Sequence, residues 1–165
     1  MPSEKMMGAL NNHMKEEFYS GYFYLAMQGY FEAESLPGFA KWFRVQAEEE
    51  LGHALKFYAY IADVGGRVTL MPIPAPKRDF ASAKAVFEEG LAHEKNVTAA
   101  IHKLMELAKA EKDYPTESFL QWFVNEQVEE EKNFTEVLQM VTRAGDGRGL
   151  VFVDHRLSRR GGEKE

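Results

Sequence analysis

The order of apolar and polar residues along the chain is that of long amphipathic helices. Apolar side chains recur every three or four residues, which places them on one face of an α-helix. Turn-forming residues interrupt the pattern at "LPG" (36–38), "GG" (65–66) and "DYP" (113–115), and in a glycine-rich segment at 145–149. We therefore predict four long helices and one short helix, over residues 4–34, 38–64, 82–111, 115–144 and 149–159.

The lengths of the connections predict how these helices are arranged. The first and third connections are short, so the helices that they join should pack antiparallel. The second, residues 65–81, spans about 56 Å when it is extended, whereas the second helix is about 40 Å long, so this connection can cross the whole bundle. We predict an all-α fold: one domain over 1–165, with a four-helix bundle over 4–144, a long crossover between helices two and three, a short fifth helix, and a disordered tail over 160–165.

Each long helix has a polar residue near the middle of its apolar stripe. In the second helix, Glu50 and His53 lie between Phe43 and Phe57 at core spacing. Helices of similar length that pack side by side share the level of their midpoints, so the polar side chains should converge in the core. The converging residues are Glu17, Glu50, His53, Glu94, Gln127 and Glu130.

Four glutamates in one apolar core require positive charge. A buried carboxylate without a partner is costly, and neighbouring carboxylates raise the cost. Metal ions would supply the charge, and oxygen ligands with a single histidine suit iron or manganese better than zinc. A central carboxylate could bridge two ions. Glu50 and His53, three residues apart, share a helix face; Glu49 and His53 are the alternative pair, but Glu50 lies on the apolar stripe.

Taken one at a time, these signals have ordinary structural explanations. A lone Glu-x-x-His is weak, the run 129–131 is typical of a solvated helix face, and Gln28 and Gln46 read as core hydrogen-bond partners. Tyr24, two turns after Glu17, either serves a metal site as hydrogen-bond partner or electron donor, or is an amphipathic core tyrosine. The other histidines lack a carboxylate partner on an apolar stripe and are expected at the surface or in interfaces: His13, His93, His102 and His155.

Composition excludes several classes of function. The chain has 165 residues, a formal net charge of −6 and no cysteine. Its negative charge argues against non-specific binding to nucleic acid, and the lack of cysteine excludes disulfides, thiolate zinc sites and cysteine-ligated iron–sulfur clusters. No signal-peptide pattern and no apolar run of membrane-spanning length is found, so we expect a cytoplasmic protein without membrane contact.

The buried glutamates leave two interpretations open at this point. One is a di-iron or di-manganese oxidase that acts on an organic substrate, which would need a pocket beside the metals, where aromatic packing leaves little obvious room. The other is a structural bundle without metal, which would have to bury four glutamates although no lysine or arginine lies on the stripes. The aromatic residues beside the predicted site are Phe43, Phe57, Phe123 and Phe134.

Four segments together resemble the bacterial non-haem ferritins. They are "EEFYSGYFYLAM" around Glu17, "AEEELGHALKFYAYI" around Glu50 and His53, "HEKNVTAAIHKL" around Glu94, and "FLQWFVNEQVEEE" around Gln127. The resemblance runs from about Met6 to Leu157, and "GLVFVDHRLS" is similar to the family's short fifth helix. It implies a hollow homo-oligomeric shell of twenty-four subunits, with iron stored inside as a ferric mineral.

The resemblance also implies a ferroxidase centre in each subunit, where dioxygen or hydrogen peroxide oxidises two ferrous ions. Glu17, Glu50 and His53 match the ligands of the first iron, with Glu50 bridging. Glu94 and Glu130 match ligands of the second iron. Gln127 matches an amide that the family has at this site, and Tyr24 matches the family's tyrosine beside the centre. The ligands of a third iron in the family are matched by Glu49, Glu126, Glu129 and Glu130.

At several positions this chain differs from families related to the bacterial non-haem ferritins. Bacterioferritins bind haem through a methionine just after the bridging glutamate, whereas this chain has Leu51, so no haem is expected. Bacterioferritins and rubrerythrins carry a second Glu-x-x-His where this chain has Gln127 and Glu130, and mini-ferritins lack a fifth helix. A shell also needs subunit contacts, for which we expect exposed aromatic residues: Tyr19, Tyr22, Phe23 and Tyr30.

Overall fold

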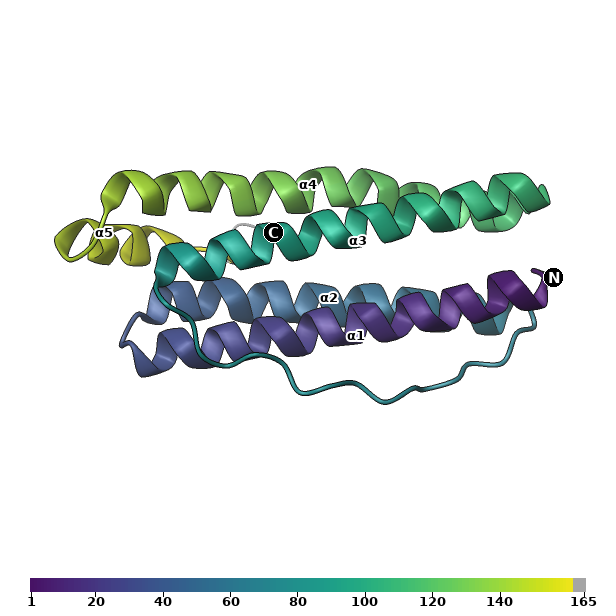
Figure 1. The fold of residues 1–165 in the computed structure, drawn as a ribbon, viewed down its shortest axis with the longest axis horizontal. Helices are drawn as coiled ribbons and strands as arrows, with labels where there is room; N and C mark the ends of the chain where they lie inside the picture. Colours follow the sequence, from purple (N-terminus) through teal and green to yellow (C-terminus); the bar gives the residue numbers. More distant parts are fainter. Residues whose placement is uncertain (162–165) are drawn as a thin grey trace.

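The computed structural model, which describes residues 1–161, is a four-helix bundle with a fifth helix at one end (Figure 1). This confirms the predicted all-α fold with a short fifth helix. The helices are α1 (Glu4–Ala33), α2 (Pro37–Asp63), α3 (Ala83–Glu111), α4 (Tyr114–Ala144) and α5 (Arg148–Leu157).

Side-chain caps explain where three of the long helices begin. The hydroxyl of Ser3 accepts a hydrogen bond from the amide of Met6, at 3.0 Å, at the start of α1. Ser82 does the same at the start of α3, and the carboxylate of Asp113 at the start of α4. Each cap satisfies an amide that has no partner within its helix.

The bundle consists of two antiparallel hairpins, α1 with α2 and α3 with α4, joined by a long crossover. Figure 1 shows this crossover running along the length of the first hairpin, so that α2 and α3 are parallel, as predicted. Asn11 of α1 fastens the crossover, because its side chain donates to the carbonyl of Arg67 at 3.1 Å and accepts from the amide of Thr69 at 2.7 Å.

The apolar core is divided into two clusters, one toward each end of the bundle. One cluster contains Phe31, Phe43 and Phe87, and the other contains Leu10 and Phe57. The polar residues from the helix midpoints lie between them, so the site is closed at both ends by fully buried side chains.

The fifth helix is tied to the start of α2. Leu36 at the N-cap of α2 gives no side-chain hydrogen bond, and Asp154 of α5 supplies one by accepting from the amide of Phe39 at 2.9 Å. Gly38 permits this approach, since a Cβ atom there would lie 1.7 Å from the carbonyl oxygen of Asp154.

The tail after α5 was expected to be disordered from residue 160 onward. In the structure, Arg160 instead makes several hydrogen bonds to α2. Residues 162–165 lie outside the described part of the chain.

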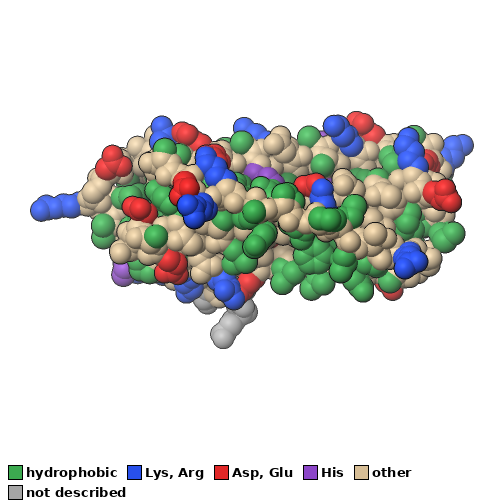
Figure 2. Space-filling view, turned by 60° about the horizontal axis from the view of Figure 1, so that its bottom comes forward, with side chains coloured by type: hydrophobic (Ala, Val, Ile, Leu, Met, Phe, Trp, Pro, Cys, Tyr) green, Lys and Arg blue, Asp and Glu red, His purple; other side chains and the backbone are tan. Residues whose placement is uncertain are grey.

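Hydrophobic side chains gather on the face formed by the first hairpin and the crossover (Figure 2). Tyr22 is exposed there, as expected, but Phe23 is buried against Phe80 and His93, so its assignment to an exposed contact was wrong. Apolar side chains line a groove between α1 and α2, namely Phe18, Tyr22, Leu25, Leu51 and Ile73.

Within the described residues, no helix combines the length and apolar character needed to span a bilayer.

Candidate metal centre

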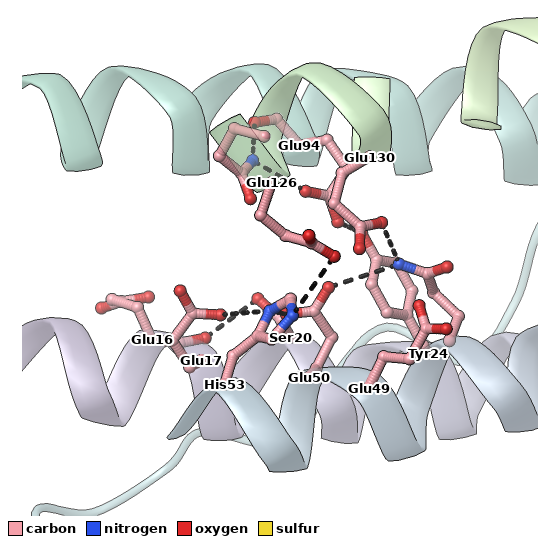
Figure 3. A network of polar contacts seen from close by, with 12 residues as sticks. Glu16, Glu17, Ser20, Tyr24, Glu49, Glu50, His53, Glu94, Glu126 and Glu130 are labelled. Carbon is pink, nitrogen blue, oxygen red and sulfur yellow. Dashed lines mark hydrogen bonds and ion pairs between the residues drawn. The ribbon is translucent and has the colours of Figure 1, made fainter. Parts of the chain in front are cut away.

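The six polar residues expected to converge lie together in the layer between the two apolar clusters. The first hairpin contributes Glu17, Glu50 and His53, and the second contributes Glu94, Gln127 and Glu130. All six are at most 5% exposed. Figure 3 shows Glu17 and Glu50 extending from the first hairpin, and Glu94 and Glu130 from the second, into the space between the hairpins.

Atoms suited to bind a metal fall into overlapping groups, and within each group they lie within 4.8 Å of one another. The three groups are Glu17 with Glu50 and His53, Glu50 with Glu94 and Glu130, and His53 with Glu126 and Glu130. The first two groups share Glu50, so its carboxylate lies between two potential metal positions.

Two glycines allow the helices that carry these ligands to approach closely. A Cβ atom at Gly21, one turn after Glu17, would lie 3.3 Å from the carbonyl oxygen of Ala47. A Cβ atom at Gly90 would lie 2.3 Å from the ring of Phe134, which packs against α3 at this point. Gly90 precedes Glu94 by one helical turn, so this packing sets the spacing of the carboxylates on α3 and α4.

Glu17 and His53 form the charged pair of the cluster. Burial favours a neutral Glu17, but its hydrogen bond with His13 and the nearby imidazole of His53 outweigh that effect and hold the pKa of Glu17 well below its usual value. Burial would lower the pKa of His53, but its contacts with Glu17 and Glu50 raise that pKa to about 11. In the metal-free protein at neutral pH, Glu17 is therefore an anion and His53 a cation.

The pKa values of the other three carboxyl groups are raised, which favours their protonated forms. Burial, together with the charge of Glu17, raises the pKa of Glu50 well above its usual value. Burial, and the repulsion that an ionised Glu50 would add, raise the pKa of Glu94 in the same way. Burial, and the repulsion that an ionised Glu94 would add, raise the pKa of Glu130 to about 8. Without cations, these shifts thus oppose the ionisation of all four buried carboxyls at once.

One oxygen in the cluster lacks a hydrogen bond. Among the described residues, Oε2 of Glu17 is the single buried side-chain nitrogen or oxygen without such a partner. Nδ1 of His53 lies 3.7 Å from this oxygen, beyond hydrogen-bond distance. A buried, ionised oxygen without a donor is costly, and a cation between Glu17, Glu50 and His53 would satisfy it. The residues present therefore fit a metal ion.

Two amides and a phenol orient the carboxylates. Gln127 donates to Glu94 Oε2 at 3.0 Å, and Tyr24 donates to Glu94 Oε1. Gln46 donates to Oε1 of Glu50 at 3.3 Å and also to Glu130. Gln127 and Tyr24, expected beside the site, thus reach it through Glu94, and Gln46 is a core hydrogen-bond partner, as expected.

Of the four residues expected at a third iron site, the structure brings Glu126 and Glu130 into one ligand group with His53, but Glu49 and Glu129 belong to no group. Glu126 is half-buried, with Oε1 at 3.8 Å from Nε2 of His53. Glu49 turns toward Arg160, at 3.3 Å. Glu129 is exposed and belongs to none of the three ligand groups.

Two histidines expected at the surface or in interfaces belong to the surroundings of the site. His13 is 3% exposed, and its Nε2 lies 2.8 Å from Oε1 of Glu17. Nε2 of His93 lies 2.7 Å from the hydroxyl of Ser20. The signal for His13 was available, because it precedes Glu17 by four residues and so shares its helix face.

The fold and the cluster define a class: four-helix bundles whose facing helices direct glutamates and histidine inward, an arrangement that holds paired metal ions in known proteins. The chain belongs to the ferritin-like family, since residues 7–144 match the sequence profile of the ferritin-like domain.

Known proteins support this assignment along most of the chain. A bacterial non-heme ferritin of Staphylococcus epidermidis is 44% identical over 93% of this chain and 92% of its own length. The corresponding protein of Staphylococcus aureus is 40% identical over the same shares. A solved ferritin of Archaeoglobus fulgidus, described as an open-pore ferritin, is 45% identical, with a TM-score of 0.96 over 97% of this chain and 99% of that one.

Proposed function

We propose that this chain is a ferritin subunit that binds two ferrous ions in its carboxylate cluster, oxidises them, and passes ferric iron to a mineral stored inside a protein shell. The observation that carries the proposal is the pair of ligand groups that share Glu50. Family membership and the unpartnered oxygen of Glu17 support it. Iron is the substrate and the cargo.

The chemistry of the ligands suits this oxidation. One ion would lie among Glu17, Glu50 and His53, and the other among Glu50, Glu94 and Glu130. Carboxylates are hard anions, so they favour the ferric product over the ferrous substrate. Each of the two ions gives one electron, so dioxygen with two protons becomes hydrogen peroxide, and a peroxide oxidant with two protons becomes two waters. Paired delivery of electrons avoids a one-electron product.

Gln127 makes the second position suited to turnover. Related sites carry a glutamate there, so the amide lowers the negative charge around the second ion by one. Its hydrogen bond to Glu94 restrains that carboxylate without adding charge. We expect Gln127→Glu to slow the release of ferric iron from the centre, as measured by the recovery of rapid oxidation after a first iron addition. Unchanged recovery would contradict this role.

A shell requires contacts between copies of the chain. The apolar groove on the first hairpin presents Tyr22, Leu25 and Leu51 to solvent, each more than 40% exposed. Exposed apolar patches of this kind mark association surfaces. We assign one contact between subunits of a closed homo-oligomer to this groove.

The decisive experiment adds ferrous iron in air at large excess over subunits and follows iron and protein together by size-exclusion chromatography. Storage requires iron to co-elute with a shell-sized particle. Glu50→Ala should lose rapid oxidation while the shell still assembles, and Glu106→Ala, which changes an exposed glutamate of α3, is the control. A small species that retains a few iron atoms while the rest precipitates would favour the di-iron oxidase instead.

A further inference from the structure

The segment after α5 places a half-buried arginine beside the carboxylate cluster. The guanidinium of Arg160 donates to the carbonyl oxygen of Trp42 at 3.1 Å, to Oε1 of Gln46 at 2.8 Å and to Oε2 of Glu49 at 3.3 Å. It also lies over the ring of Trp42, 4.2 Å from the centroid. With three hydrogen bonds and a stacking contact, this side chain is held in one orientation.

Arg160 determines which way the amide of Gln46 points. The oxygen of this amide accepts from the guanidinium, so its nitrogen faces the cluster and donates to Glu50 and Glu130. The reversed amide would set its N–H groups against the N–H groups of the guanidinium and lose this hydrogen bond. Arg160 therefore reaches both carboxyl groups through one rigid intermediate.

The guanidinium also lies where a third cation would be expected. Glu49, one of the four glutamates that a third iron site would use, is already paired with Arg160. Glu130, another of the four, is bonded to Gln46. A metal ion bound by Glu49 and Glu130 would have to displace both interactions and stand next to a fixed positive charge.

We propose that Arg160 is a positioning residue that takes the place of a third cation, holding Glu49 and Gln46 so that the subunit binds two divalent ions instead of three. This inference rests on the proposed function, because it takes the cluster to be a dinuclear site. It assigns the C-terminal segment a role in setting how many ions each subunit binds.

Zinc tests the inference without redox chemistry. Titration of the assembled, metal-free protein with zinc in a calorimeter should give two ions per subunit for the wild type and for Arg159→Ala, which removes an exposed arginine next to Arg160. Arg160→Ala should bind a third ion, and Arg160→Lys should return the number to two, because the ammonium restores the charge. Adding Glu49→Gln to Arg160→Ala should also return it to two.

The outcomes separate this inference from the proposed function. Two ions in Arg160→Ala, or three in the wild type, would overturn the role of Arg160 and leave the dinuclear site standing. A wild type that binds no zinc tightly would overturn the proposed site and the inference with it. Circular dichroism and size-exclusion chromatography of each variant show whether it has folded and assembled, so a misfolded variant is replaced by Arg160→Gln.

Discussion

Loading the cluster with metal should release a defined number of protons. His53 and Glu130, with pKa values of about 11 and 8, hold protons at pH 7 in the metal-free protein, and the raised pKa values of Glu50 and Glu94 favour their protonated forms. Metal ligands bind in their deprotonated form. Filling both positions should therefore release at least about two protons per subunit at pH 7, and up to about four if Glu50 and Glu94 are protonated as well. Zinc is the suitable probe, because it does not consume or release protons through oxidation.

The sign of the pH dependence follows from the same groups. Protons compete with the metal wherever a ligand's pKa lies above the ambient pH, so affinity for zinc rises with pH. Because the pKa of Glu130 is about 8, this residue is largely ionised at pH 9, where the release should be about one proton smaller than at pH 7. At pH 7, Glu130→Gln should release one proton fewer than the wild type.

Proton release is measured by calorimetry in buffers of different ionisation enthalpy, or with an indicator dye in weakly buffered solution. The exposed variant Glu129→Gln serves as the control, since it should leave the count unchanged. A release of one proton or none at pH 7 would show that the buried carboxyls are ionised without metal. That result would refute the argument that burial and mutual repulsion keep them neutral.

Three further predictions concern packing and support of the site. Gly90→Ala should destabilise the fold by about 1–3 kcal/mol in urea unfolding, because the fully buried ring of Phe134 cannot yield to a new methyl group. Asp154→Ala should cost about 1–2 kcal/mol and expose α5 to limited proteolysis, because an amide at the start of α2 loses its acceptor. His13→Ala should weaken zinc binding about 10-fold or more in calorimetry, because Glu17 loses the contact that orients it.

Each of these predictions has a control of the same chemistry. Gly29→Ala is open to solvent and should be neutral or stabilising by up to about 1 kcal/mol, since alanine favours a helix. Asp146→Ala and His102→Ala change exposed residues and should leave α5 docking and zinc affinity unchanged. If a control matches its test variant, the loss comes from a general effect of the substitution and the specific contact is not its cause.

The fold was predictable because its determinants are periodic and local. Apolar spacing fixed four helical segments, and the length of the crossover fixed the parallel order of α2 and α3. The convergence of Glu17, Glu50 and Glu94 followed from a geometric fact, that helices of similar length share the level of their midpoints. Neither inference needed the detailed orientation of any side chain.

The parts that were missed depend on contacts between residues distant in sequence. Arg160 reaches Gln46 because Asp154 anchors α5 to the start of α2. The spacing of apolar residues in the sequence does not predict that the chain after α5 packs against α2. The burial of Phe23 depends on the position of the crossover, which places Phe80 against it. His13 could have been found by its spacing from Glu17, but its burial depends on Phe57 of the neighbouring helix.

The division of the ligands between two hairpins has a consequence for the cohesion of the subunit. Each hairpin pairs helices that are neighbours in sequence, so each is assembled from local contacts, and the carboxylate layer is part of the joint between them. Ions bound there would act as cross-links across this joint. At a free metal concentration 100 times the dissociation constant, binding at one position adds about 2.7 kcal/mol to the folded state. The supply of iron would then regulate how firmly the two halves of each subunit hold together.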